Sequence, residues 1–160
     1  SSDYATTADV LLEVLANYKK VRKEFDYMAC LYPTNPFITS KKLIDAMGML
    51  EKYDATEILP IVQFSYPPQR AYVYSDDARI KYKWKEFISS RSQDLEKMYH
   101  DAGQFYCYNI QKFIECKGKI NDNIYPIICC ELEVQDIDNE EDWKLAEIKY
   151  EYIRRYKTYE

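Results

Sequence analysis

Short apolar runs alternate with segments of helical periodicity, and this alternation constrains the fold more than any other feature of the sequence. The apolar runs lie near residues 27–32, 57–64, 104–108 and 125–134, and the amphipathic segments lie near 7–22, 40–50, 109–116 and 141–156. Helices that alternate with apolar strands predict an α/β fold with a mostly parallel sheet. Ligands of such sheets bind beyond the carboxyl ends of the strands, so the residues that follow each run are candidates for a functional site.

Local signals predict where several of these elements begin and end. Thr6-Thr7-Ala8-Asp9 has the pattern of a capping box, and Thr39 or Ser40 can cap the second helix. Gly118 can end the third helix. Pro60 lies inside the second apolar run and has no amide hydrogen, so we expect a bulge or an edge position there.

The stretch from residue 67 to residue 100 departs from the alternation. Ala71–Tyr74 and Ile80–Tyr82 flank Ser75-Asp76-Asp77-Ala78, which predicts a β-hairpin, and residues 84–103 are polar and predicted to be irregular. The hairpin is rich in Tyr and Trp, the residues that most often anchor protein interfaces. We therefore expect a homodimer in which the hairpin reaches the partner, within a single domain over residues 1–160.

Composition excludes several classes of function. The net charge of −5 argues against a nucleic-acid-binding surface, and the 3 Gly leave no Gly-rich phosphate loop. A single His excludes a multi-histidine metal site, and no apolar run approaches the roughly 20 residues of a membrane span. The 5 Cys form no C-x-x-C motif, so we expect reduced thiols in a cytoplasmic protein.

Two aspartates, Asp136 and Asp138, follow the last apolar run. Residues two apart in an extended chain project to the same side, so both carboxylates can reach one cleft. A hard cation such as Mg²⁺ prefers oxygen ligands and usually binds substrate phosphates as well. The alternative interpretation is structural, because Asp138-Asn139-Glu140-Glu141 also matches a capping box for the last helix.

A dense polar stretch between the hairpin and the third run offers further candidates for substrate binding. Arg can hold a carboxylate through two hydrogen bonds, and Gln can bind sugar hydroxyls. A solvated loop held by ion pairs is equally compatible with this composition. The candidates in this stretch are Arg91, Gln93, Asp101 and Gln104.

Two weaker patterns accompany this stretch. Pro33-Thr34-Asn35-Pro36 could present the Thr34 hydroxyl to a substrate on a rigid loop, or could form a plain turn. His100 beside Asp101 could be a base and its orienting carboxylate, but no Ser or Cys pattern completes a triad.

The order of these motifs resembles the acylneuraminate cytidylyltransferases, which make CMP-activated nonulosonic acids. Residues 31–37 are similar to the strand-end motif of that family, and residues 134–143 are similar to its terminal D-I-D motif and the acidic helix start that follows. Segments 69–71, 91–96 and 99–106 are most similar to the pseudaminic acid branch. The resemblance extends from Ser2 to the last helix.

The resemblance implies transfer of CMP from CTP to the anomeric hydroxyl of a nine-carbon keto-sugar acid, with release of pyrophosphate. It also implies a Rossmann-like three-layer fold, dependence on Mg²⁺ and a homodimer. It places Asp136 and Asp138 at the metal, as the catalytic residues. It implies that Gln93, Gln104 and Tyr106 line the sugar pocket, and that Arg70 and Arg91 lie near the sugar acid or a phosphate.

The chain departs from the family pattern in two ways. Tyr32 stands where members that use sialic acid usually carry Gln, which argues against ordinary sialic acid as the substrate. Family members also begin with a strand and a basic Gly-rich loop that binds CTP, and nothing similar precedes Ser1. The chain thus resembles the downstream part of the enzyme, truncated at its N-terminus.

The missing strand leaves a structural expectation and two alternative functions. We expect an uncovered sheet edge that a segment before Ser1 or another chain fills, because unpaired buried backbone groups are costly. One alternative function is a non-catalytic module that binds a sugar acid or only dimerises. The other is a related nucleotidyltransferase with a different sugar substrate.

Overall fold

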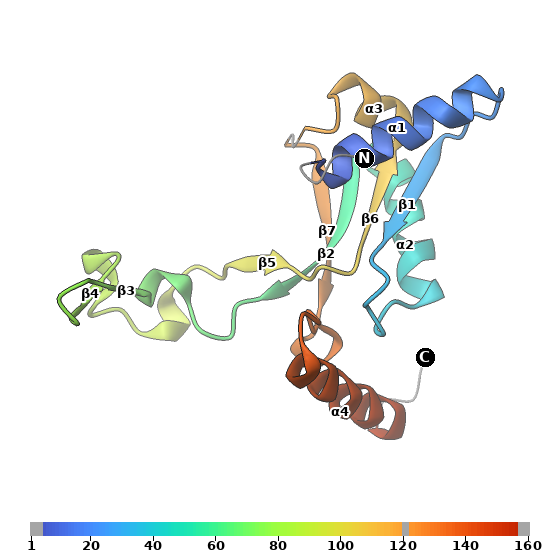
Figure 1. Cartoon of the computed structure of the whole chain (residues 1–160). Coiled ribbons are helices and arrows are strands. Elements are labelled where there is room, and N and C mark those ends of the chain that lie inside the picture. The colour runs from blue at the N-terminus through green and yellow to red at the C-terminus, as the bar shows by residue number, and fades with distance from the viewer. Residues whose placement is uncertain (1–4, 120–121, 157–160) are drawn as a thin grey trace.

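The computed structural model describes residues 5–119 and 122–156. Its main sheet places four strands side by side, in the order β1, β6, β2 and β7 (Figure 1). A short strand, β5 (Tyr99–Asp101), pairs with β2 beyond the point where the antiparallel strand β6 begins. The four strands are β1 (Tyr27–Leu31), β6 (Phe105–Asn109), β2 (Glu57–Gln63) and β7 (Ile124–Cys129).

The directions of the strands confirm part of the sequence-based expectation. β1, β2 and β7 point the same way, whereas β6 lies between β1 and β2 and is antiparallel to both. The α/β class is therefore confirmed, but a mostly parallel sheet is not. The reason is that the chain leaves β2 for a long excursion and returns as β5 and β6 without a crossover helix, which favours antiparallel pairing.

Pro60 occupies the central strand β2 without disturbing it. Its carbonyl accepts a hydrogen bond from the Ala102 amide, so the backbone of Pro60 faces the side of β5 and β6. The pairing changes there from β6 at Ile58 to β5 at Ile61, and the amide hydrogen that proline lacks falls at this break. β2 is a central strand, so the expected edge position is wrong, and in place of a bulge the pairing on this side of β2 passes from β6 to β5 at Pro60.

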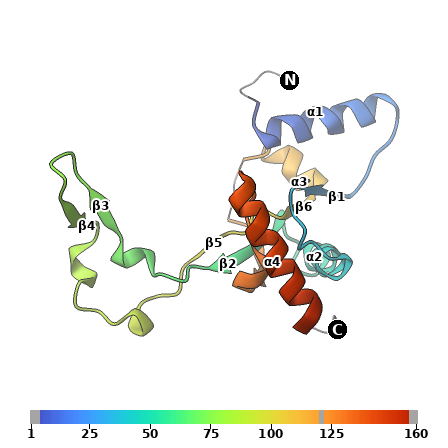
Figure 2. The same ribbon diagram turned by 60° about the horizontal axis from the view of Figure 1, so that its bottom comes forward.

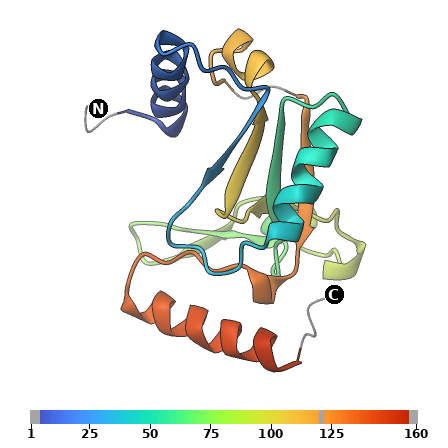
Figure 3. The same cartoon turned by 90° about the vertical axis from the view of Figure 1, so that its right-hand side faces the viewer.

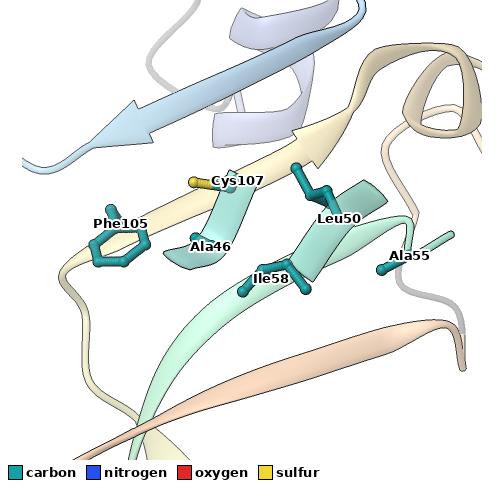
Figure 4. Packing of buried hydrophobic residues seen from close by; sticks show 6 residues of the cluster. All are labelled: Ala46, Leu50, Ala55, Ile58, Phe105 and Cys107. Carbon is teal, nitrogen blue, oxygen red and sulfur yellow. The ribbon is translucent and has the colours of Figure 1, made fainter. Parts of the chain in front are cut away.

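One helix, α2 (Ser40–Lys52), covers one face of the sheet and forms the main core with it. The Thr39 hydroxyl accepts a hydrogen bond from the Lys42 amide, so Thr39, one of the two predicted candidates, caps this helix. Figure 4 shows the buried cluster between helix and strands. Its members are Ala46, Leu50, Ala55, Ile58, Phe105 and Cys107.

The other helices lie at the two ends of the sheet. α1 (Thr7–Lys20) and α3 (Ile110–Glu115) lie at the end where β1 and β2 begin, and α4 (Glu140–Tyr156) lies beyond the end where they stop (Figure 3). The predicted capping box of α1 is present between Thr6 and Asp9. Among the described residues, no helix combines the length and apolar character that a membrane crossing requires.

The segment of residues 65–98, which we name the arm, projects away from the sheet (Figures 1 and 2). It contains the predicted hairpin, formed by β3 (Tyr72–Tyr74) and β4 (Ile80–Tyr82). The Tyr72 and Tyr82 hydroxyls are hydrogen-bonded at 2.9 Å across the two strands. Large side chains remain exposed on the arm, with Tyr66 88% and Tyr74 72% exposed. The arm is therefore an excursion without a core of its own.

The edge of the sheet at β1 is uncovered in the described part of the chain. There, β1 pairs only with β6, and exposed apolar side chains line α1. No disulfide joins any of the 5 cysteines in the described structure, and Cys129 is buried whereas its neighbour Cys130 is exposed.

Gly118 contributes to the packing of α1 against α3, and we expect Gly118→Ala to destabilise the fold. Gly118 has a φ of +66°, and an added Cβ would lie 2.8 Å from the Ala8 Cβ and 3.1 Å from the Phe113 ring. The loss of unfolding free energy should be about 1–3 kcal/mol in urea titrations. Gly103 has a φ of +62° and open space around it, so Gly103→Ala is the matched control for strain alone. Equal losses in both variants would contradict a packing role.

Glu57 gives the protein a predicted pH dependence of stability. Burial raises the pKa of its carboxyl, against a hydrogen bond from Tyr108 that lowers it. The folded state therefore binds more protons than the unfolded state above the ordinary glutamate pKa of about 4.3, and stability falls as the pH rises through that range. We expect Glu57→Gln to be more stable than the parent at pH 8 and equally stable at pH 4. If the unfolding free energies of the parent and of Glu57→Gln changed in parallel with pH, this expectation would be contradicted.

Candidate functional site

A cavity of about 540 Å³ lies at the carboxyl ends of β1, β2 and β7, and we name it the strand-end cavity. Tyr32, which directly follows β1, and Gln63, at the end of β2, line it. Residues 131–136, which follow β7, contribute Glu131, Val134, Gln135 and Asp136 to its wall. The sheet topology therefore creates this cavity at the edge where α/β sheets bind ligands, despite the antiparallel β6.

Asp101 and Tyr106 form a fixed polar pair in the cavity wall. The Tyr106 hydroxyl donates to one carboxylate oxygen of Asp101 at 2.6 Å, and the Gly103 amide donates to the other at 2.7 Å. Burial, reinforced by the hydrogen bond to Asp101, raises the pKa of Tyr106, so its hydroxyl stays protonated and remains a donor. A carboxylate offers about four acceptor sites, so Asp101 retains about two for a ligand.

Two aromatic side chains extend this wall. The rings of Tyr32 and Tyr106 meet edge to face with their centroids 5.4 Å apart. Tyr32, which departs from the pattern of sialic acid enzymes, thus lines the cavity.

His100 also lines the cavity, but Asp101 does not orient it through the carboxylate. Its Nδ1 lies 2.8 Å from the backbone carbonyl of Asp101, so Nδ1 carries the hydrogen and donates it. The Asp101 side chain is occupied by Gly103 and Tyr106. The sequence lends little support to His100 as a base that the Asp101 carboxylate orients, and the structure does not show this arrangement.

Asp136 and Asp138 line different pockets. Asp136 faces the strand-end cavity, whereas Asp138 lines an open pocket beside Trp143 at the start of α4. Asn139 caps α4, since its side-chain oxygen accepts from the Glu141 amide at 2.9 Å and from the Asp142 amide at 3.1 Å. The structural interpretation in which Asp138 is the cap is therefore wrong.

The carboxylates of the cavity fit a hard divalent cation. Asp101, Glu131 and Asp136 all line it. Within residues 5–119 and 122–156, no three His, Cys, Asp or Glu side chains gather closely enough to hold a metal by themselves. Mg²⁺ needs only one or two carboxylates when substrate phosphates and water complete its shell, so the donor set suits this ion.

Gln104 and Thr34 do not line the cavity. Gln104 is fully buried behind the wall, where its Nε2 donates to the Glu133 carbonyl and its Oε1 has no hydrogen-bond partner in the described chain. Thr34 lines a separate apolar pocket of about 270 Å³ between its loop and α4, with Trp143 and Tyr150. Neither placement tests their predicted role in substrate binding.

Three other predicted residues lie on the arm, away from the cavity. Gln93 lies in a 3-10 turn (Ser92–Asp94) that Arg91 precedes, and the Arg70 guanidinium donates to the Ser92 hydroxyl at 3.3 Å. None of Arg70, Arg91 and Gln93 lines the strand-end cavity of the described chain. The structure therefore places Asp101, Tyr106 and Asp136 in the cavity wall and three predicted residues on the arm. Thr34, Gln104 and Asp138 belong to neither group.

Several residues of the cavity escaped the sequence analysis. Gln63 and Ser65 end an apolar strand and belong to no motif, and Glu131 lies in a segment predicted to be strand. Lys149 approaches from the middle of α4, where a lysine ordinarily faces solvent. No sequence pattern distinguishes Lys149 from the other basic residues of that helix.

Comparison with known proteins relates the chain to one family of enzymes. No protein-family model matches it. It is 28% identical over 150 residues to a pseudaminic acid cytidylyltransferase of Campylobacter jejuni, across 94% of this chain and 65% of the relative. It is 31% identical over 138 residues to a Helicobacter pylori protein named pseudaminic acid cytidylyltransferase and UDP-2,4-diacetamido-2,4,6-trideoxy-beta-L-altropyranose hydrolase, across 86% of this chain and 26% of that protein.

The fold is similar to that of a solved sugar-acid synthetase. A structure of CMP:2-keto-3-deoxy-manno-octonic acid synthetase complexed with CTP matches with a TM-score of 0.56 and 13% identity, across 96% of this chain and 70% of that one. This likeness shows the fold alone and confirms the Rossmann-like class. The resemblance to the CMP-nonulosonic acid synthetases is likewise confirmed, while the chain spans 65% of the length of the Campylobacter relative.

Proposed function

We propose that this chain forms part of a cytidylyltransferase that transfers CMP from CTP to a nonulosonic acid. The observation that carries the proposal is the strand-end cavity, which Asp101, Tyr106 and Asp136 all line. Asp101 and Tyr106 come from a segment that resembles the pseudaminic acid branch, and Asp136 comes from the motif that resembles the D-I-D motif of the whole family. Curated relatives named pseudaminic acid cytidylyltransferase align with 94% of the chain.

The reaction exchanges one bond to phosphorus for another. A sugar hydroxyl attacks the α-phosphorus of CTP, a new oxygen–phosphorus bond forms, and the bond to the departing pyrophosphate breaks. The hydroxyl proton leaves to water or to a nearby acceptor. Positioning and electrostatic stabilisation therefore provide most of the catalysis, and the protein has little covalent chemistry to perform.

The wall of the cavity has the groups needed to orient a sugar. Asp101 is fixed by two hydrogen bonds and still has free acceptor sites for sugar hydroxyls. The Tyr32 and Tyr106 rings provide an apolar surface next to it. We expect Asp136 to hold Mg²⁺, which when bound would stabilise the charge that develops on the phosphate oxygens.

We further propose a cytoplasmic homodimer. The arm exposes Tyr66, Tyr74 and Ile80, which is typical of a surface that a partner covers. The arm also carries Arg70, Arg91 and Gln93, which do not line the cavity of their own chain. The arm of a second copy would bring these residues to the cavity. The cysteines, none of which forms a disulfide in the described structure, and the use of CTP both favour the cytoplasm.

A direct assay tests the proposal. The full-length gene product should convert CTP and pseudaminic acid into a CMP-sugar and pyrophosphate, both detectable by mass spectrometry and a coupled phosphate assay. N-acetylneuraminic acid should be a poor substrate, since Tyr32 replaces the usual Gln. Failure to form a CMP-sugar from any nonulosonic acid would contradict the proposal.

A further inference from the structure

The wall segment of residues 131–136 lacks regular strand pairing and is held in place by side chains from other elements. It begins with a 3-10 turn (Glu131–Glu133) after β7 and continues without regular structure to Asp136. From α2, Lys42 forms an ion pair with the Glu133 carboxylate at 3.0 Å, and both side chains are largely buried. Gln104 donates to the Glu133 carbonyl. These contacts fix the first half of the segment, on the side of the core.

The second half, which carries Asp136, is held from α4 by Lys149. The Lys149 ammonium donates to the Val134 carbonyl at 2.7 Å and to the Gln135 side-chain oxygen at 3.0 Å. The Gln135 amide nitrogen in turn donates to the Asp136 carbonyl at 3.0 Å. Lys149 is thus connected through Gln135 to the backbone of Asp136, and both ends of this chain of hydrogen bonds line the cavity.

The burial of Lys149 distinguishes it from the other basic residues of α4. Lys144, Arg154 and Arg155 are exposed, whereas Lys149 is only partly exposed. A partly buried ammonium costs desolvation free energy, which hydrogen bonds to two oxygens offset. Hydrogen bonds from a charged donor are stronger than those between neutral groups, so this contact can restrain an otherwise irregular segment.

We propose that Lys149 is a positioning residue, which holds residues 134–136 so that the Asp136 carboxylate faces the strand-end cavity. It acts through Gln135 and the backbone and need not touch the reacting atoms. The functional half of this inference rests on the proposed cytidylyltransferase activity. The mechanical half, the restraint of the segment by Lys149, stands independently of any activity.

Hydrogen–deuterium exchange tests the mechanical half in the full-length gene product. Lys149→Met keeps most of the side-chain volume and removes both hydrogen bonds. Amides of residues 134–138 should exchange about tenfold faster in this variant, whereas amides of β6 should exchange as in the parent. Arg154→Met removes an exposed cation from the same helix and should change neither region. Unchanged exchange at residues 134–138 in Lys149→Met overturns the inference.

Kinetics test the functional half. Lys149→Met should raise the Mg²⁺ concentration for half-maximal activity about tenfold and leave the KM for the sugar acid within about twofold. A general loss of folding would not produce this separation. Faster exchange without a change in the Mg²⁺ requirement would overturn the functional half. If the parent makes no CMP-sugar, the proposed function fails, and the exchange experiment alone still decides the role of Lys149.

Discussion

Asp136→Asn should lower kcat by about a hundredfold or more without lowering the melting temperature. Asp136 lines the cavity, and no hydrogen bond between its carboxylate and another described residue is observed. Replacing the carboxylate by an amide of the same size removes a negative charge from a wall that also contains Asp101 and Glu131. Like charges repel when no cation is bound, so stability should stay the same or rise.

Two companion variants separate catalysis from helix capping. Asn139→Ala removes the cap of α4 and should cost about 0.5–2 kcal/mol of unfolding free energy. Asp138→Asn leaves this cap intact, so it should not lower the melting temperature. If Asp138 also binds the metal, as the resemblance implies, this variant should lower kcat. The measurements are activity against Mg²⁺ concentration and the melting temperature of each variant. Full activity of Asp136→Asn at every Mg²⁺ concentration would contradict the metal role.

The sequence predicted the elements well because most of them depend on local signals. The helices at 7–20 and 40–52 begin at the side chains that the capping patterns indicated, Thr6 and Thr39. The hairpin lies where its turn residues predict it. β5 was missed, because Tyr99-His100-Asp101 is short and polar and becomes a strand only by pairing with Gln63, Val62 and Ile61.

The arrangement of these elements depends on tertiary contacts, which no local pattern in the sequence indicates. The direction of β6 follows from the return of the arm, and an apolar strand has the same pattern in either direction. The last strand was predicted to reach residue 134 but ends at Cys129, where Lys42 and Gln104 hold the following segment in a different conformation. Asp101 and Tyr106 could be named from their motif, whereas Lys149 required the packing of α4.

The division of the predicted site between cavity and arm leads to the second prediction. Arg91 and Asp136 lie on separate parts of the chain, and only Asp136 lines the cavity. If the arm of one subunit serves the cavity of its partner, each site of the homodimer combines Asp136 of one chain with Arg91 of the other. Either substitution alone then inactivates both sites of the dimer.

Subunits that carry different substitutions should complement each other. Asp136→Asn and Arg91→Ala homodimers should each have little activity, because a guanidinium that pairs with a carboxylate or phosphate has no substitute in Ala. After unfolding and refolding together in equal amounts, half of the dimers are mixed, and each has one intact site. The mixture should therefore recover about a quarter of the parental activity, given a symmetric dimer that assembles at random.

Controls on the oligomeric state make this result decisive. Deletion of residues 72–83 removes the hairpin and should convert the dimer into a monomer in sedimentation experiments, since the exposed Tyr74 and Ile80 belong to it. Arg91→Ala and Asp136→Asn should remain dimeric, because neither removes an apolar contact of the hairpin. No recovery in a mixture shown to contain mixed dimers would mean that Arg91 and Asp136 act within one chain. In that case the arm would have to fold back over its own cavity, and the deletion would leave the oligomeric state unchanged.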